Sequence, residues 1–237
     1  MKTVSRVTLI LGCIVLFASC SIFSKNKSED TYRANYLTTD LSPAMNKSNG
    51  TMPSVNKGKG SLPVNNPINE RLTLNNRASQ LKMYVRNNGF STSYCFLIDM
   101  SLPSGWKRFF VYDLAKNSIV LSGLVSHGNC NQNSLVEAKF SNTPSTGCSS
   151  MGKYRVGVSY EGGYGKSYKL HGLESTNSNA YSRAVVLHGF GCVPDEEIYP
   201  ATICNTQGCA GVSFNFLKRI STIIDQSKKP ILLWIYK

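Results

Sequence analysis

The sequence predicts a mainly β domain with one helix before its strands and a second helix near the C-terminus. Short runs rich in β-branched, aromatic and other apolar residues recur between residues 95 and 237, separated by turn-forming residues. Apolar residues recur at helical spacing over residues 73–88 and again in "SFNFLKRISTIID". The first twenty residues and the polar stretch that follows them lack this pattern, so we expect them to be separate segments.

Residues 1–20 are predicted to be a signal peptide of the lipoprotein type. Lys2 and Arg6 precede an apolar run, Val7 to Phe17, that is too short to span a bilayer as a helix. The ending Ala-Ser-Cys is typical of a bacterial lipobox, so Cys20 is expected to carry a lipid. The protein would then be exported and anchored on the periplasmic face of the cell envelope. A plain signal peptide, in which Cys20 is incidental, is the alternative.

Residues 21–70 are predicted to be a flexible tether. They are rich in Asn, Ser, Thr, Lys, Gly and Pro, and they show neither a helical nor a strand period. Such a segment cannot bury enough apolar area to offset the entropy lost on ordering. A coil of this length has an end-to-end distance of roughly 40 Å, which would let a folded domain reach away from a membrane.

Residues 71–237 are predicted to be the folded domain, and it begins with a helix at about 73–88. Leu74, Leu81 and Val85 share one helical face with Ala78 beside them, and Gly89 is suited to end the helix. The strands are expected in "CFLIDM", "KRFFVYDL", "SIVLSGLVS", "GKYRVGVSY", "SYKLHGL", "RAVVLHGF" and "PILLWIYK", with a turn at "LAKN" between the second and third.

The chain is strongly basic, with 26 Lys and Arg residues against 13 Asp and Glu residues and a formal net charge of +13. No motif that interleaves aromatic and basic residues accompanies this charge, so a nucleic-acid partner is not expected. For an exported protein, the polyanion that fits is the cell envelope itself, through peptidoglycan stem peptides and anionic lipid headgroups.

The stretch "NTQGCAGV" places Cys209 among small residues, where a thiol would be open to a large substrate. A cysteine nucleophile needs a base or a positive neighbour, and His188 ends the apolar strand that leads toward this loop. A helix that begins near Val212, with Ser213 as its N-cap, would also favour a nearby thiolate. The backbone N–H groups of Gly208 and Cys209 could form an oxyanion hole.

The cysteines allow other interpretations. Six remain after Cys20, and in an exported protein they can pair. A Cys192–Cys204 bridge would leave Cys209 free, and a Cys130–Cys148 bridge would leave Cys95 as a buried thiol. A Cys₃His zinc site that uses His188 is a weaker alternative because its spacing lacks the usual paired cysteines, so we assign no metal. A Cys204–Cys209 disulfide that traps the nucleophile is a further hypothesis.

From Cys95 to Lys237 the chain resembles the L,D-transpeptidase catalytic-domain family, in its exported murein branch. The resemblance rests on blocks that include "VSHG", "KFSNTPSTGCSSMGKY", "SRAVVLHG" and "TQGC", with "ILLWIYK" as the last strand. In the family motif, a histidine is followed after a gap by Ser/Thr-x-Gly-Cys. Here the histidine is His188, and the motif ends at Thr206-Gln207-Gly208-Cys209.

This resemblance implies a β-rich, sandwich-like fold and a thiol peptidyl transferase that acts on peptidoglycan stem peptides without a cofactor. Cys209 would attack the carbonyl of the L-centred residue before a terminal D-alanine, and an amine of a neighbouring stem peptide would resolve the thioester. His188 would be the base, oriented through the backbone of Gly189. The resemblance places three further residues near the substrate: Arg183, Thr206 and His127.

Two other functions stay open at this point. If water resolves the thioester, the same site gives an L,D-carboxypeptidase. Asn205 and Ala210 stand where the exported branch often has arginine and proline, which leaves room for a peptidoglycan-binding lipoprotein with a decayed site.

Overall fold

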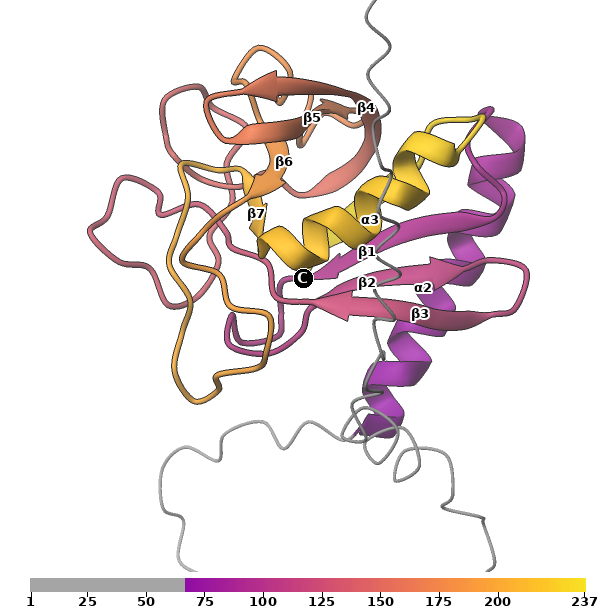
Figure 1. Cartoon of the computed structure of the whole chain (residues 1–237), viewed down its shortest axis with the longest axis horizontal. Helices are drawn as coiled ribbons and strands as arrows, with labels where there is room; N and C mark the ends of the chain where they lie inside the picture. Colours follow the sequence, from indigo (N-terminus) through magenta and orange to yellow (C-terminus); the bar gives the residue numbers. More distant parts are fainter. Residues whose placement is uncertain (1–66) are drawn as a thin grey trace, which may run out of the picture. The chain divides into compact units, whose positions relative to one another are not determined.

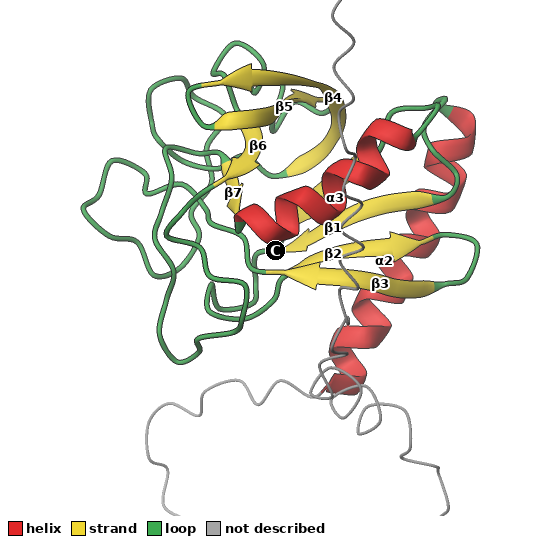
Figure 2. Cartoon of the chain, in the orientation of Figure 1, coloured by secondary structure: helices red, strands yellow, loops and turns green. Residues whose placement is uncertain are grey.

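In a computed structural model of the chain, residues 67–237 are described, and they form an eight-stranded sheet with two helices (Figures 1 and 2). The mainly β prediction is therefore confirmed. In chain order, the elements are α2 (Pro67–Asn87), β1 (Tyr94–Asp99), β2 (Phe109–Asp113), β3 (Ser118–Gly123), β4 (Gly152–Gly162), β5 (Gly165–Gly172), β6 (Val186–Gly189), β7 (Ala210–Val212), α3 (Phe214–Gln226) and β8 (Leu232–Tyr236).

The last strand of the chain lies in the middle of the sheet, whose order is β3-β2-β1-β8-β4-β5-β6-β7. β8 runs parallel to β1 on one side and antiparallel to β4 on the other. It therefore joins an N-terminal group of three strands to a second group, β4 to β7, in which the candidate site lies. Within that second group β6 and β7 are parallel, and their register aligns Leu187 with Ala210.

Strands β1, β2 and β8 are buried on both faces, as their nearly continuous apolar sequences require. In Figure 1, α3 lies in front of this part of the sheet and α2 lies behind it. Alternate side chains belong to two different cores. One core, which α3 joins, includes Phe96, Val111 and Leu233, and the other, which α2 joins, includes Leu97 and Leu232.

The first helix of the described chain begins earlier than its apolar pattern predicts. It starts at Pro67 rather than near residue 73, and it ends at Asn87. Its first turn carries no apolar period, but proline suits the first helical position because its fixed φ matches the helix. Leu74, Leu81 and Val85 are buried as expected, and Gly89 follows the helix with φ +73°.

The helix after Cys209 is confirmed together with its cap. Ser213 is the N-cap of α3, and its hydroxyl accepts a 3.1 Å hydrogen bond from the backbone N–H of Phe216. This bond satisfies one of the N–H groups that a helix start leaves without a partner. The helix buries Phe216, Ile220 and Ile224 against the core, which fixes the position of the residues just before it.

The predicted signal peptide, with Cys20, and nearly all of the predicted tether lie outside the described residues. Over residues 67–237, neither helix is long and apolar enough to cross a membrane.

Candidate active site

Cys209 and His188 lie on the same face of two neighbouring strands. His188 belongs to β6, and Cys209 immediately precedes β7, one residue before the Leu187–Ala210 pair. Leu187 and Ala210 point into the core that α3 shares. Since side chains alternate along a strand, His188 and Cys209 both point to the opposite face. Strands about 4.8 Å apart and an offset of two residues place the two Cα atoms about 8 Å apart, within reach of the two side chains.

The imidazole of His188 is held by the backbone of the next residue. Its Nδ1 lies 2.8 Å from the carbonyl oxygen of Gly189. A carbonyl oxygen only accepts, so Nδ1 carries the hydrogen and Nε2 keeps its lone pair. Burial lowers the pKa of His188, and the Gly189 carbonyl opposes this in part. The ring is therefore neutral near pH 7, the form in which it can act as a base.

A tyrosine covers this imidazole. Tyr164, in the turn between β4 and β5, stacks on the ring of His188 with centroids 4.0 Å apart and an interplanar angle of 24°. Tyr164 is itself 55% exposed, so it forms the outer wall beside His188. In the sequence, Tyr164 is marked only by its position as a single aromatic side chain among glycines, in "GGYG", between two predicted strands.

The thiol of Cys209 is half-buried, and its sulfur lies 3.9 Å from the carbonyl oxygen of Ala184. Burial raises the pKa of the thiol, while a backbone hydrogen bond with Val186 and the charge of Arg183 oppose the increase. A raised thiol pKa beside a lowered imidazole pKa means that both groups rest in their neutral forms. A thiol in this form needs a base to remove its proton before it can act as a nucleophile.

The loop before Cys209 is held by Thr206. Its hydroxyl donates to the carbonyl oxygen of Cys209 at 2.7 Å and accepts from the N–H of Gly208 at 3.2 Å. Gly208 has φ +109°, and a Cβ on it would lie 2.7 Å from the carbonyl oxygen of Cys148. Only glycine fits here. The hydroxyl of Thr206 thus bonds within the loop, and its predicted contact with substrate stays a prediction.

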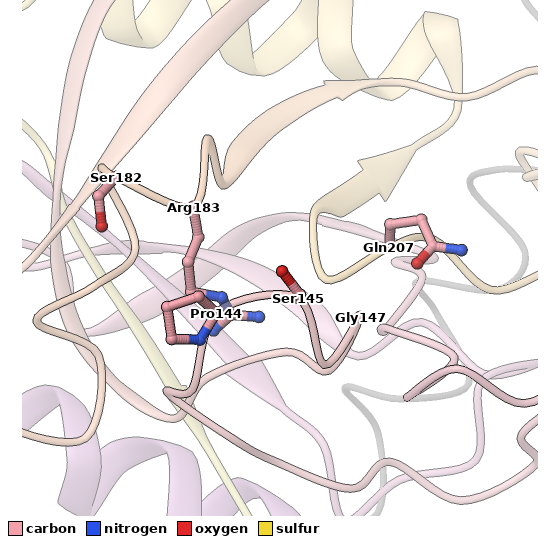
Figure 3. Close-up of a pocket in the computed structure, with 6 residues that line it drawn as sticks. All are labelled: Pro144, Ser145, Gly147, Ser182, Arg183 and Gln207. Atoms are coloured by element: carbon pink, nitrogen blue, oxygen red, sulfur yellow. The ribbon is translucent and has the colours of Figure 1, made fainter.

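Arg183 lines a pocket of about 410 Å³ next to this loop. Figure 3 shows Arg183 and Gln207 on opposite sides of the pocket in this view. The guanidinium donates to the carbonyl oxygens of Ser141 and Cys148, at 2.8 and 2.5 Å, and to the hydroxyl of Ser150, at 2.6 Å. Among the ion pairs of residues 67–237, none involves Arg183. Its charge is positioned by neutral oxygens and is left without a carboxylate.

A family model of the L,D-transpeptidase catalytic domain matches residues 68–236. The chain belongs to the L,D-transpeptidase catalytic-domain family. Solved structures similar to it include the cell shape determining protein Pgp2 (K307A mutant) of Campylobacter jejuni, with 11% identity and a TM-score of 0.40 over 69% of this chain and 56% of that one.

Two further solved structures are similar to this chain. One is the L,D-transpeptidase of Xylanimonas cellulosilytica, residues 123–326, with 13% identity and a TM-score of 0.35 over 62% of this chain and 61% of that one. The other is the Ldtfm–avibactam carbamoyl enzyme, with 9% identity and a TM-score of 0.37 over 61% of this chain and 49% of that one. The chain thus spans about half to three-fifths of these structures. No curated protein sequence matches it.

Two disulfides lie in the segments around the candidate site. Both expected bonds are present, Cys130–Cys148 and Cys192–Cys204. The Cys130–Cys148 bond fixes Cys148. The carbonyl oxygen of Cys148 accepts from Arg183 and leaves no room for a Cβ on Gly208. Cys95 is the buried free thiol that was expected, and Cys209 is also free.

These disulfides exclude two of the alternatives. The Cys₃His zinc site is wrong, because the Cys192–Cys204 bond removes two of its ligands. Cys204 is likewise not bonded to Cys209. Within residues 67–237, no group of three or more His, Cys, Asp or Glu side chains could hold a metal ion.

The expectation that His127 lines the cleft is not supported. The ring is fully buried, and both of its nitrogens bond inside the protein. Nδ1 lies 2.8 Å from Nη2 of Arg108, and Nε2 lies 3.0 Å from the carbonyl oxygen of Leu135. Burial and the Arg108 charge lower the pKa of His127 to about 4. His127 is therefore a neutral hydrogen-bonding group inside the protein.

The side chain of Asn205, just before Thr206-Gln207-Gly208-Cys209, bonds to the backbone of Leu135. Its side-chain oxygen accepts from the N–H of Leu135 at 2.8 Å, and its side-chain nitrogen donates to the Leu135 carbonyl at 3.0 Å. This paired contact ties the loop of Cys209 to the segment at residue 135. Arginine at this position could not reproduce it, because a guanidinium has no acceptor.

Proposed function

We propose that this protein is a cysteine-dependent peptidoglycan L,D-transpeptidase that works through a thioester. One observation supports this most strongly: the free thiol of Cys209 shares a strand face with His188, whose Nδ1 is bonded to the Gly189 carbonyl and whose Nε2 is left as a base. A free, half-buried thiol beside a neutral imidazole is the arrangement that nucleophilic acyl transfer needs.

In the proposed reaction, Nε2 of His188 takes the proton of the Cys209 thiol as the sulfur attacks the carbonyl of the L-centred residue before a terminal D-alanine. The carbonyl oxygen becomes negative, and we assign the backbone N–H groups of Cys209 and Gly208 as the donors that stabilise it. The imidazolium then protonates the departing D-alanine amine, which leaves a thioester. An amine of a second stem peptide attacks the thioester, passes a proton back through His188, and releases the thiol.

Without substrate, the N–H of Gly208 donates to the Thr206 hydroxyl instead of to an oxyanion. That bond is 3.2 Å long, weaker than a charge-assisted bond to an oxyanion. Formation of the oxyanion would therefore draw the Gly208 N–H away from Thr206. The bond from Thr206 to the Cys209 carbonyl, at 2.7 Å, would keep the loop in place meanwhile.

Arg183 is the residue that we propose for the terminal carboxylate of the donor peptide. Its guanidinium has no acidic partner in the described ion pairs and opens onto the pocket beside Gly208. A planar guanidinium suits a carboxylate. Bonds to two carbonyl oxygens and a hydroxyl fix the group before substrate arrives, which reduces the entropy lost on binding.

We further propose that the protein is exported and lipid-anchored through Cys20. Two disulfides fit an oxidising compartment. The net charge of +13 fits attraction to the anionic envelope.

The test is incubation of the purified protein with muropeptides that bear tetrapeptide stems, followed by chromatography and mass spectrometry. Cross-linked dimers with loss of D-alanine support the transpeptidase. Tripeptide monomers identify the same site as a carboxypeptidase, and unchanged muropeptides identify a binding protein. Cys209→Ala must abolish product. Cys95→Ala is the matched control, because that free thiol is buried in the core beside α2.

A further inference from the structure

The face that carries Cys209 and His188 continues onto the neighbouring strands. Register pairs His188 with Ser167, and Val186 with Lys169 on β5. Directly paired residues share a face of the sheet, so Lys169 points to the same side as the candidate catalytic pair. Lys169 is half-buried, and nothing in the proposed reaction uses it.

Two more basic side chains extend this surface onto β4. His171, two residues after Lys169, lies on the same face, and it pairs with Arg155 on β4. The charges of Arg155 and Lys169 both act on His171, where with burial they lower its pKa. Within residues 67–237, no ion pair involves Arg155 or Lys169. We call Arg155, Lys169 and His171 the β4–β5 basic cluster.

Aromatic rings hold the ammonium group of this cluster in place. Nζ of Lys169 lies 4.8 Å from the ring centre of Tyr181 and 5.7 Å from that of Tyr160. Tyr181 also stacks on His171, with centroids 4.7 Å apart. A lysine fixed between two rings loses less rotamer entropy when it binds an anion than a free surface lysine does. The amino group of Lys169 is therefore positioned by aromatic rings, and no carboxylate of residues 67–237 forms an ion pair with it.

The β4–β5 basic cluster lies close enough to the Cys209 thiol for one short extended peptide to contact both. Lys169 is level with Val186, and Val186 is beside Cys209 on the next strand. Two strand spacings place the Cα atoms of Lys169 and Cys209 about 10 Å apart, the length of about three extended residues. Arg183 instead reaches the loop of Gly208, next to β7. Lys169 thus approaches the thiol from β5, and Arg183 approaches it from the turn that precedes β6.

We propose that the β4–β5 basic cluster is a subsite for a second carboxylate of the donor peptide, on the residue that precedes the one attacked by Cys209. This deepens the proposed function and rests on it. The donor would then be an acidic stem peptide, held by its terminal carboxylate at Arg183 and by an internal carboxylate at Lys169 and Arg155. A donor with a carboxamide in place of the internal carboxylate would lose the contact with Lys169 and Arg155.

The experiment uses two tetrapeptides that differ only in that group, carboxylate or carboxamide, and the full-length Cys209→Ala protein, which cannot turn them over. Isothermal titration calorimetry should give a dissociation constant about fivefold lower for the carboxylate peptide, the size of one partly screened charge contact. Lys169→Gln should remove that preference and leave binding of the carboxamide peptide unchanged, and Lys169→Arg should retain it. Lys229→Gln, at an exposed lysine before β8, should have no effect.

Equal affinities of the two peptides for the Cys209→Ala protein would overturn the subsite. So would an equal loss for both peptides on Lys169→Gln, or no binding of either peptide. Turnover of both peptides by the wild-type protein at equal rates would reject the subsite and keep the transpeptidase. Preferential binding of the carboxylate peptide without any turnover would support the subsite and reject the transpeptidase.

Discussion

Replacing Gly208 by alanine is the sharpest single perturbation of the loop that holds Cys209. The new Cβ would meet the Cys148 carbonyl oxygen at 2.7 Å, on a residue with φ +109°. Backbone strain of this kind costs of order 1–3 kcal/mol, and relief of the overlap adds about 1 kcal/mol. The carbonyl cannot easily retreat, because Cys148 is disulfide-bonded and its oxygen also accepts from Arg183.

We therefore expect Gly208→Ala to lower the stability of the protein by about 3 kcal/mol, or the melting temperature by about 6–12 °C for a domain of this size. Differential scanning calorimetry measures this, and turnover of muropeptides should fall as the thiol is displaced. Gly163→Ala is the control, because a Cβ there meets nothing within 4 Å. A Gly208→Ala protein that melts within about 1 °C of wild type and keeps full turnover would show that the Cys148 carbonyl does not restrict this position.

Three further outcomes follow from the same structure. The pKa of His188 is lowered, so turnover should fall as pH drops through a midpoint below 6.5. The pKa of Cys209 is raised, so the rate of iodoacetamide labelling of the thiol should reach half of its maximum above pH 9.0; a half-maximal rate at pH 6 would contradict this. The pKa of His127 is lowered from 6.5 to about 4, so its contribution to stability is complete above pH 6.5 and is lost toward pH 4, about 3 kcal/mol by linkage. His127→Gln should reduce the slope of the free energy of unfolding against pH, measured by urea titrations at several pH values. Replacing Cys192 and Cys204 together by serine opens a loop with a sequence separation of 12 and should cost about 3 kcal/mol, and an unchanged urea midpoint would count against the bond.

The sequence predicted the local elements well, because their signals are local. The α3 helix has an apolar period and a serine cap, and most strands are bounded by turn residues. β7, at Ala210–Val212, escaped prediction because three residues carry no period. The central position of β8 also could not be predicted, since it depends on pairing with β1 and β4, which are far from it in sequence.

Some residues of the candidate site could likewise be predicted from local sequence signals, and others could not because their role depends on long-range packing. Cys209 and Gly208 stand out because Thr-x-Gly-Cys is short and local, and His188 stands out because it ends an apolar strand. His127 looked like a cleft residue from its motif block, but the buried guanidinium of Arg108, nineteen residues away, determines its environment. Lys169 carried no signal in the sequence, because its importance depends on which strand lies beside β6. Residue type predicted the chemistry, and long-range packing decided which side chains reach it.

In the proposed reaction, the sulfur of Cys209 forms the acyl bond to the stem peptide. Mass spectrometry of the protein quenched with acid during turnover of a tetrapeptide donor detects that bond. We predict a mass increase equal to the donor minus D-alanine, located on the proteolytic fragment that contains Cys209 and lost on treatment with hydroxylamine. Turnover at an undiminished rate by Cys209→Ala, or an adduct confined to another residue, would contradict the account.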